Sequence, residues 1–130
     1  MFNSAIKLSN VSKSYLQGGK GVSVLKDINI DVREGEFVSI TGPSGSGKTT
    51  LLNIIALIDS LDSGKLNVFG EDLSVLSDKQ KSLFRKNNFG FVYQSNNLFD
   101  DFNAIENVAL PLILNGYNKY DAYNESENVL

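Results

Sequence analysis

A glycine-rich segment near the middle of the chain restricts the possible folds more than any other feature of the sequence. Residues 42–50 read Gly-Pro-Ser-Gly-Ser-Gly-Lys-Thr-Thr, so lysine and threonine follow directly after the last glycine. An apolar run, Phe37–Ile40, precedes this segment, and a second run, Leu51–Ile55, follows it. The pattern predicts a strand, a tight loop and a helix, because glycine lets the loop turn sharply and point several main-chain N–H groups inward.

The residues of this segment suit an anion with several negative charges. Main-chain N–H groups at the start of a helix bind phosphate, because the helix dipole adds positive potential there. Lys48 is expected to reach the β- and γ-phosphates as a point charge, and the Thr49 hydroxyl is expected to occupy one position on a bridging Mg²⁺. The sequence therefore predicts a phosphate-binding loop for a nucleoside triphosphate, formed by Gly42, Pro43, Ser44, Gly45, Ser46, Gly47, Lys48, Thr49 and Thr50.

The composition excludes several other kinds of site. The 130 residues are 42% hydrophobic, which is enough for the core of one domain. A net charge of −3 argues against a general nucleic-acid binder, and we expect no nucleic-acid partner. The chain has no cysteine and no histidine, which excludes disulfides, thiolate metal sites and an imidazole base. No stretch reaches the roughly 18 apolar residues of a membrane-spanning helix, so we expect membrane contact through another protein.

Hydrophobic periodicity predicts mostly strands in the first part of the chain and helices in the second. The expected strands are Ala5–Val11, Val22–Val32, Phe37–Thr41, Lys65–Gly70 and Phe89–Tyr93. The expected helices are Gly47–Asp59, Asp78–Lys86, Ala104–Leu114 and a last helix that begins near Lys119 and is cut off by the end of the chain. Ser77 and Gln80 have the spacing of a capping box for the helix that follows them.

This order of elements indicates an α/β fold. We expect a P-loop NTPase core with an N-terminal antiparallel β subdomain and the start of a helical subdomain. The β subdomain and the core are expected to occupy about residues 1–94, and the start of the helical subdomain about residues 95–130.

Three further features narrow the families that carry such a loop. The run Val11–Tyr15 places an aromatic residue well ahead of the loop, Gln94 follows an apolar run well after it, and Ile105–Leu112 comes soon after that glutamine. Together with the loop, these features resemble the ATP-binding subunit of an ABC transporter. The resemblance extends over nearly the whole chain but covers only the N-terminal half of that family's domain. The details are most similar to the subgroup that powers lipoprotein release from the bacterial inner membrane, with macrolide and peptide exporters nearby.

The resemblance implies functions for residues outside the loop. Tyr15 is similar to the aromatic residue that stacks on adenine, and Val24 would flank that ring. Gln94 is similar to the glutamine whose amide reaches the Mg²⁺ or the attacking water, which makes it a candidate catalytic residue beside Lys48 and a candidate metal ligand beside Thr49. From the residues alone, Tyr15 could instead pack on the β subdomain, and Gln94 could be an ordinary loop amide.

The resemblance also implies partners and a location. The polar loop Leu98–Phe102 carries large apolar side chains and is similar to the surface that receives a coupling helix of the transmembrane permease subunits. The same side chains could instead form a small cluster beneath their own loop. A second ATP-binding subunit would complete the ATP site, and the protein would lie peripherally on the cytoplasmic face of the bacterial inner membrane.

The motifs of the family's second half do not occur in these 130 residues. There is no Leu-Ser-Gly-Gly-Gln signature, no apolar strand that ends in Asp-Glu and no switch histidine. The family takes its catalytic glutamate and its contact to the γ-phosphate from those motifs. We therefore expect a truncated form that binds MgATP weakly and hydrolyses it slowly or not at all, so its status as an enzyme on its own is open.

Two other functions are compatible with the sequence. Guanylate kinases carry a nearly identical Gly-Pro-Ser-Gly loop and transfer phosphate to a nucleoside monophosphate, but their chains open with that loop, whereas β structure and an aromatic residue come first here. The chain could also be a non-catalytic nucleotide-binding or assembly module, whose unpaired sheet edge would favour association. Phosphate transfer from ATP to GMP distinguishes the first alternative from a transporter subunit.

Overall fold

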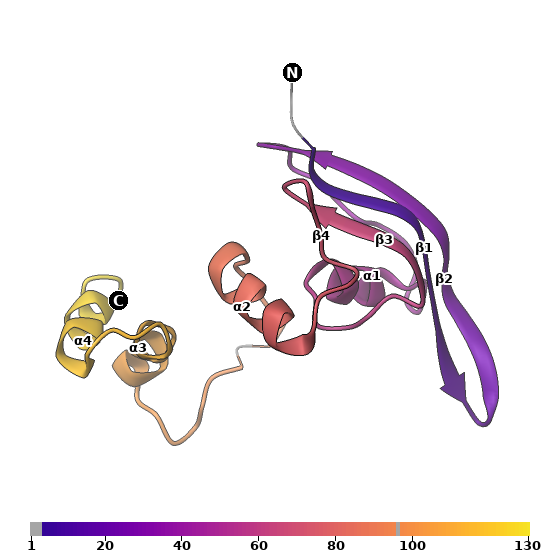
Figure 1. Ribbon diagram of the computed structural model, residues 1–130. Helices are drawn as coiled ribbons and strands as arrows, with labels where there is room; N and C mark the ends of the chain where they lie inside the picture. The colour runs from indigo at the N-terminus through magenta and orange to yellow at the C-terminus, as the bar shows by residue number, and fades with distance from the viewer. Residues whose placement is uncertain (1–3, 96) are drawn as a thin grey trace. The chain divides into compact units, whose positions relative to one another are not determined.

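The computed structural model describes residues 4–95 and 97–130. The chain divides into two compact units, one that ends at Gly90 and one that runs from Phe91 to Leu130. The first unit contains a β-sheet and two helices, and the second contains two helices (Figure 1).

The first unit is built on a four-stranded antiparallel sheet. Its strands, in the order β2-β1-β3-β4, are β1 (Ser4–Gln17), β2 (Lys20–Arg33), β3 (Ser63–Val68) and β4 (Glu71–Asp72). β1 and β2 form a long hairpin around Gly18 and Gly19, whose φ angles of 58° and 78° match the left-handed backbone that a tight hairpin turn needs. The expected antiparallel β subdomain is confirmed, although β1 and β2 are longer than predicted and β4 is not among the predicted strands.

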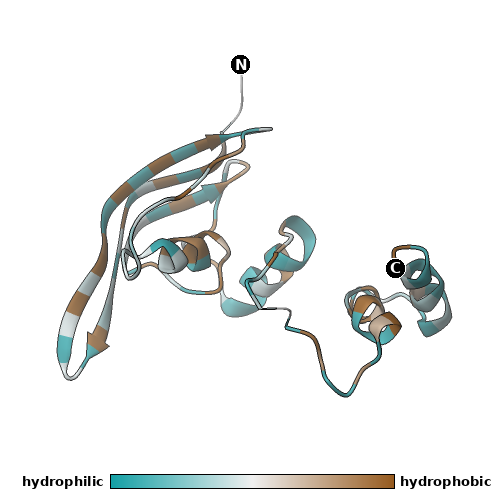
Figure 2. Cartoon of the chain, turned by 180° about the vertical axis from the view of Figure 1, so that it is seen from behind, coloured by the Kyte–Doolittle hydropathy of each residue, from teal (hydrophilic) through white to brown (hydrophobic). Residues whose placement is uncertain are grey.

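One face of the sheet forms the core of the first unit. Side chains along a strand point to alternate faces, and apolar and polar residues alternate along much of the strands (Figure 2). The helix α1 (Lys48–Ile55) contributes Leu51 and Ile54, which are both buried. The other buried members of this cluster are Leu8, Val11, Leu25, Leu57, Leu66, Val68 and Leu73. Full burial of one such side chain contributes about 1.5–3 kcal/mol, so the core holds α1, and with it the start of the helix, against the sheet.

α1 is shorter than the sequence predicts. The predicted helix reaches Asp59, but α1 ends at Ile55, and Leu57 adopts a left-handed backbone with a φ of 58°. Leu57 is 5% exposed and belongs to the core, so its burial compensates for a conformation that residues other than glycine rarely adopt. The chain therefore leaves the helix early and returns to β1, where the Asp62 N–H donates to the Ser12 carbonyl at 3.0 Å.

Two predicted strands are absent from the described residues. Phe37–Thr41 and Phe89–Tyr93 form neither helix nor strand, and no β-ladder includes them. Phe37 is 97% exposed and Val92 is fully exposed, so these apolar side chains are not covered. The prediction of buried strands here is wrong, because an apolar run becomes a strand only where another strand bonds to it, and the described part of the chain supplies none.

The helix α2 (Asp78–Asn88) completes the first unit. Its predicted capping box is confirmed, since the Ser77 N–H donates to Gln80 Oε1 at 2.9 Å. Arg85 Nη1 donates to the Leu57 carbonyl at 2.5 Å, which ties α2 to the turn that follows α1.

The second unit contains the helices α3 (Ala104–Leu114) and α4 (Lys119–Glu127). Asparagine side chains cap both helices, Asn103 for α3 and Asn118 for α4. The predicted bounds of α3 are confirmed. The prediction that the last helix continues to the end of the chain is wrong, because α4 ends at Glu127.

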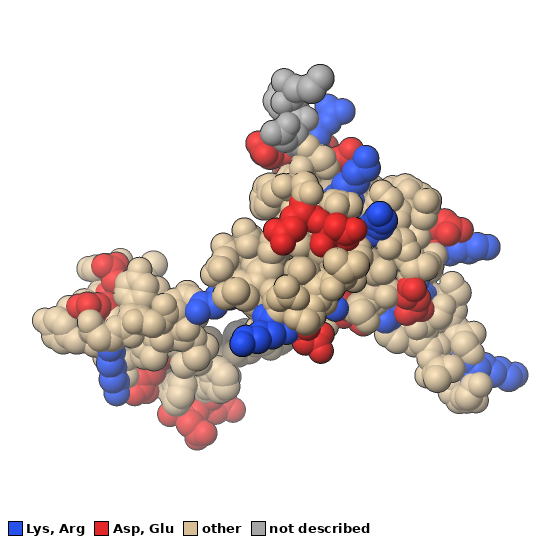
Figure 3. Space-filling view, in the orientation of Figure 1, with Lys and Arg blue, Asp and Glu red and all other residues tan. Residues whose placement is uncertain are grey.

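The surface has mixed charge. On the face of the protein seen in Figure 3, acidic and basic side chains are interspersed and form no continuous basic surface. Across the described ranges, none of the helices combines the length and the apolar character that crossing a bilayer requires.

Candidate functional site

The loop of residues 42–47 has a backbone that depends on glycine. Gly47, directly before α1, has a φ of 88°, in the left-handed region that side chains disfavour. A Cβ atom at Gly47 would lie 3.0 Å from the Val24 carbonyl oxygen and 3.0 Å from Leu25 Cδ2, which is closer than ordinary contacts allow. β2 therefore lies directly against the loop, and glycine is the residue that fits.

Lys48 begins α1, and its ammonium group lies against the loop. Lys48 Nζ donates to the Gly42 carbonyl at 2.8 Å and to the Pro43 carbonyl at 2.6 Å. Several main-chain N–H groups nearby have no acceptor, because the first N–H groups of a helix have no partner within the helix. In the part of the chain that the structure describes, no acceptor bonds to the main-chain N–H groups of Gly45, Gly47, Lys48 and Thr49.

These donors border one hollow of about 230 Å³ at the start of α1. Its lining consists of Val24, Ser44, Gly45, Gly47, Lys48, Thr49 and Thr50. A lysine, a threonine hydroxyl and unbonded amides at a helix N-terminus together suit a polyphosphate with a cation. A larger hollow of about 620 Å³ lies away from the loop, and it is lined by Ser4, Lys7, Ser9, Glu34, Asn67, Phe69 and Gly70.

Val24 reaches the loop because the β1–β2 hairpin is irregular. Lys13 lies opposite Leu25 and Ser14 lies opposite Ser23, so no residue of β1 lies opposite Val24. Such a bulge turns a side chain out of the regular alternation along a strand. The structure thereby brings Val24 to the same hollow as the loop.

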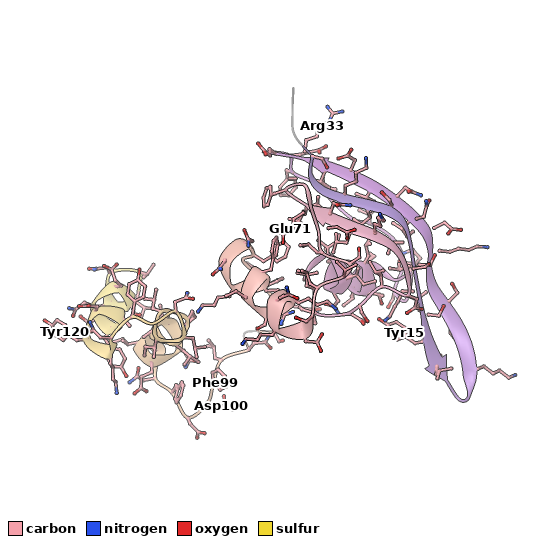
Figure 4. The ribbon with its side chains drawn as sticks, viewed as in Figure 1. Tyr15, Arg33, Glu71, Phe99, Asp100 and Tyr120 are labelled. Carbon is pink, nitrogen blue, oxygen red and sulfur yellow. The ribbon has the colours of Figure 1, made fainter. Side chains whose placement is uncertain are left out.

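Tyr15 lies on β1 opposite Val22, on the side of the sheet where α1 lies (Figure 4). Its hydroxyl donates to Asp59 Oδ2 at 2.5 Å, and Lys13 Nζ lies 5.1 Å from the centre of its ring. The residue is 40% exposed, so its ring is not part of the core. Tyr15 and Val24 belong to the same hairpin and the same unit as the loop, and stacking of Tyr15 on adenine stays a prediction.

A charged cluster in the C-terminal part of β1 is not among the sequence predictions. Lys13 is 7% exposed, and its Nζ lies 3.0 Å from Asp59 Oδ1 and 3.5 Å from Asp62 Oδ1. One signal in the sequence could have indicated it. Lys13 comes two residues after the buried Val11, so a strand places both on one face, and an inward lysine needs an anionic partner.

The charges of Lys13 and Asp59 persist over a wide pH range. Burial, the largest influence, lowers the pKa of Lys13, but the hydrogen bond to Asp59 and the charges of Asp59 and Asp62 outweigh it, so the pKa lies above the ordinary 10.5. Burial raises the pKa of Asp59, but hydrogen bonds from Tyr15 and Lys13 outweigh it, so this pKa lies below the ordinary 3.8. We call Lys13, Tyr15, Asp59 and Asp62 the Lys13 cluster.

Gln94, the other predicted catalytic residue, belongs to the second unit. It is exposed in a segment that forms neither helix nor strand. The described residues contain no group of three His, Cys, Asp or Glu side chains that could hold a metal ion. Thr49 and Gln94 as ligands of Mg²⁺, and Gln94 as a catalytic residue, stay predictions.

One side chain that the sequence did not indicate holds the loop Leu98–Phe102. Asn107 Oδ1 accepts from the Phe99 N–H at 2.8 Å, and Asn107 Nδ2 donates to the carbonyls of Phe99 at 3.1 Å and Phe102 at 3.0 Å. The two phenyl rings lie 5.5 Å apart, yet Phe99 is 58% and Phe102 is 42% exposed. The rings meet without forming a buried cluster, and contact with a partner stays a prediction.

The chain is similar to known proteins over most of its length. A family model described as ABC transporter matches residues 25–129. An uncharacterized ABC transporter ATP-binding protein of Bacillus subtilis, YknY, is 44% identical over 125 residues, which are 96% of this chain and 54% of that protein. The lipoprotein-releasing system ATP-binding protein LolD of Rickettsia bellii is 41% identical over 130 residues, which are 100% of this chain and 57% of that protein.

A solved structure confirms the expected fold. The dimeric ATP-binding cassette MJ0796, in a post-hydrolysis state bound to ADP and Pi, matches with a TM-score of 0.86 and 38% identity. The match covers 95% of this chain and 54% of that one. The chain thus spans about half the length of the relatives that it matches.

Proposed function

Because this chain belongs to the ABC transporter family, we propose that it binds MgATP at the phosphate loop, as the ATP-binding part of a transporter's motor subunit. The observation that carries the proposal is the hollow at the start of α1, where unbonded amides, Lys48 and Thr49 border one space. A triphosphate would satisfy those amides. It would also give Lys48 an anionic partner in place of two neutral carbonyls, and hydrogen bonds between charged groups are the stronger kind.

Each part of the loop has a distinct task in this proposal. The amides of the loop and of the first turn of α1 bind phosphate oxygens. Lys48 exchanges its bonds to Gly42 and Pro43 for bonds to the β- and γ-phosphates. Mg²⁺ neutralises part of the phosphate charge when it is bound, and the hydroxyl of Thr49 and the amide of Gln94 are its proposed protein ligands.

We propose that the adenine binds at the β1–β2 hairpin. Val24 borders the phosphate hollow, and Tyr15 lies opposite Val22, two positions before Val24 on β2. Stacking on a tyrosine ring suits any purine, because it uses the π-face of the base. The resulting site runs from the phosphate loop across Val24 to Tyr15.

The complete protein is proposed to act as a pair of ATP-binding subunits that drive permease subunits at the cytoplasmic face of the bacterial inner membrane. The dimeric MJ0796 structures support the pairing. The loop Leu98–Phe102, with its exposed phenyl rings, is the proposed contact to the permease. The release of lipoproteins from the inner membrane is the proposed task, which the 41% and 42% identity to two LolD proteins supports.

We expect little hydrolysis from these 130 residues alone. They contain no signature sequence, no Asp-Glu strand end and no histidine, and the family places its catalytic glutamate in that second half. Binding of ATP is therefore the property to measure. The match to the ABC transporter family argues against a guanylate kinase. We therefore expect no phosphate transfer from ATP to GMP.

Calorimetry with the intact chain tests the proposal. We expect Mg²⁺-dependent binding of ATP and of tripolyphosphate, and Lys48→Ala should weaken both roughly 10- to 100-fold, since it removes charged hydrogen bonds to phosphate. Lys79→Ala, which removes an exposed lysine of α2, is the matched control and should have no effect. A folded wild-type chain that takes up neither ligand, or a Lys48→Ala variant that matches the control, would contradict the proposal.

A further inference from the structure

The Lys13 cluster restrains the Tyr15 ring at several points. The ring hydroxyl donates to Asp59, and the Lys13 ammonium lies over one face of the ring, 5.1 Å from its centre. The next residue back, Ser14, is held as well, because its N–H donates to Asp62 Oδ2 at 2.7 Å. A partly exposed tyrosine otherwise exchanges between staggered rotamers. These contacts give the ring one orientation before any ligand arrives.

The same contacts relate the ring to the phosphate loop. Asp59 and Asp62 lie in the segment that follows α1, and α1 begins at the loop. Lys13 Nζ also donates to the Ser60 carbonyl at 2.6 Å, so β1 is fastened to this segment by an ionic contact and a hydrogen bond. The position of the Tyr15 ring is thus set by the end of the helix whose start positions Lys48.

We propose that Lys13 and Asp59 are positioning residues for the base of the nucleotide, which orient the Tyr15 ring so that a purine stacks on the face away from Lys13. The inference rests on the proposed function, because it requires a nucleotide that extends from the loop to Tyr15. Lys13 lies over one ring face, and Tyr15 is 40% exposed, so the base is assigned to the other face. A ring that is already oriented loses little freedom on binding, which favours affinity.

A purely structural cluster gives a different result from a positioning cluster. If the contacts only fasten β1 to the segment after α1, their loss affects ATP and tripolyphosphate equally or affects neither. If they orient Tyr15, their loss affects only the part of the affinity that comes from the base. The ratio of the two affinities therefore separates the two roles.

The test is calorimetry of the intact chain with MgATP and with magnesium tripolyphosphate. Tyr15→Phe keeps the ring and removes its bond to Asp59, whereas Asp59→Asn and Lys13→Met remove the charges. We expect each variant to bind ATP about 3- to 10-fold more weakly and tripolyphosphate as the wild type does. Lys7→Met, an exposed lysine of the same strand, is the matched control for Lys13→Met and should change neither affinity.

A double variant shows whether Asp59 acts through the ring. In a Tyr15→Ala background there is no ring to orient, so Asp59→Asn should cause no further loss of ATP affinity. Circular dichroism checks the fold of each variant. Should Lys13→Met fail to fold, Tyr15→Phe and Asp59→Asn carry the test without it.

The outcomes separate this inference from the proposed function. A wild-type chain that binds neither ligand overturns both. A wild-type chain that binds both ligands, with a selective loss of ATP in Tyr15→Ala but none in Tyr15→Phe, Asp59→Asn and Lys13→Met, overturns the positioning role alone. Equal losses of ATP and tripolyphosphate also overturn it, in favour of a structural cluster.

Discussion

The two ends of the proposed nucleotide site are built from different parts of the chain. The phosphate end is made largely of main chain, with amides around Gly45 and Gly47 and one lysine that begins α1. The base end is made of side chains, since Tyr15 is held by Asp59 and Lys13. A main-chain site depends on the backbone conformation of a few consecutive residues, whereas the side-chain site depends on contacts between distant segments.

This difference determines how each end responds to substitution. At the phosphate end, a single added atom at a glycine can displace the whole loop. At the base end, each charged group makes one or two contacts, so single substitutions there have graded effects. We therefore expect large, unselective losses from the loop and smaller, ligand-selective losses from the hairpin.

Gly47→Ala should have the largest effect and most directly tests this comparison. The new Cβ would lie 3.0 Å from the Val24 carbonyl at a φ of 88°, so the loop must shift away from β2. We expect ATP and tripolyphosphate binding both to fall about 100-fold or more, and the free energy of unfolding to drop by roughly 1–3 kcal/mol. Calorimetry and urea denaturation measure the two quantities.

Gly21→Ala is the matched control for this substitution. Gly21 lies in β2, its φ is not in the left-handed region, and an added Cβ meets nothing within 4 Å. Both affinities should stay at the wild-type level. If Gly47→Ala behaved like Gly21→Ala, the loop would not depend on its contact with β2, and the contrast between the two ends would be lost.

The backbone of the loop at the proposed phosphate end could be predicted from the sequence because its information is local. The spacing of Gly42, Gly45 and Gly47 before Lys48 indicates the backbone directly, and the structure has positive φ angles at all three glycines. The presence of β1 and β2 and the bounds of α3 could be predicted for the same reason, since their hydrophobic periodicity lies within the segments themselves.

Features that depend on distant partners could not be predicted. The position of Lys13 indicates that it needs an anionic partner, but no spacing rule relates it to Asp59, which lies in the segment after α1. The early end of α1 depends on burial of Leu57 in a core that several elements form. The run Phe37–Thr41 fails as a strand for a similar reason, because its apolar character cannot show whether a neighbouring strand is present.

Tyr15→Ala should have the next largest effect and should be selective. Stacking of a base on an aromatic ring contributes about 1–3 kcal/mol, so we expect ATP affinity to fall roughly 5- to 150-fold while tripolyphosphate affinity stays unchanged. Calorimetry with both ligands measures this. Tyr120→Ala, on α4 in the second unit, removes an exposed tyrosine and serves as the control. Equal losses for the two ligands would contradict a base-binding role for Tyr15 and would make the two ends alike.

The smallest expected effect is a pH dependence that belongs to the base end. The pKa of Asp59 is lowered in the folded chain, so its stabilising contribution is complete above the ordinary 3.8 and is lost as the pH falls through the folded value. The pKa of Lys13 is raised, so its contribution is complete below 10.5 and is lost as the pH rises through the folded value. Asp62 and Tyr15 are the other titratable groups of the cluster. Between pH 3.8 and 10.5, the contribution of Lys13 and Asp59 to the free energy of unfolding should not change with pH.

Urea denaturation of the wild type and Asp59→Asn at several pH values measures this effect. We expect the wild type to be more stable by about 1 kcal/mol near neutral pH, and the difference should shrink as the pH falls below 3.8. Asp101→Asn, at an exposed carboxylate in the segment before α3, is the control and should show no such trend. A difference that stayed constant into acid would mean that Asp59 acts through its shape and not its charge. Main-chain amides do not titrate. If only the Asp59→Asn variant differs from the wild type in a pH-dependent way, the pH sensitivity lies in the side chains that hold Tyr15.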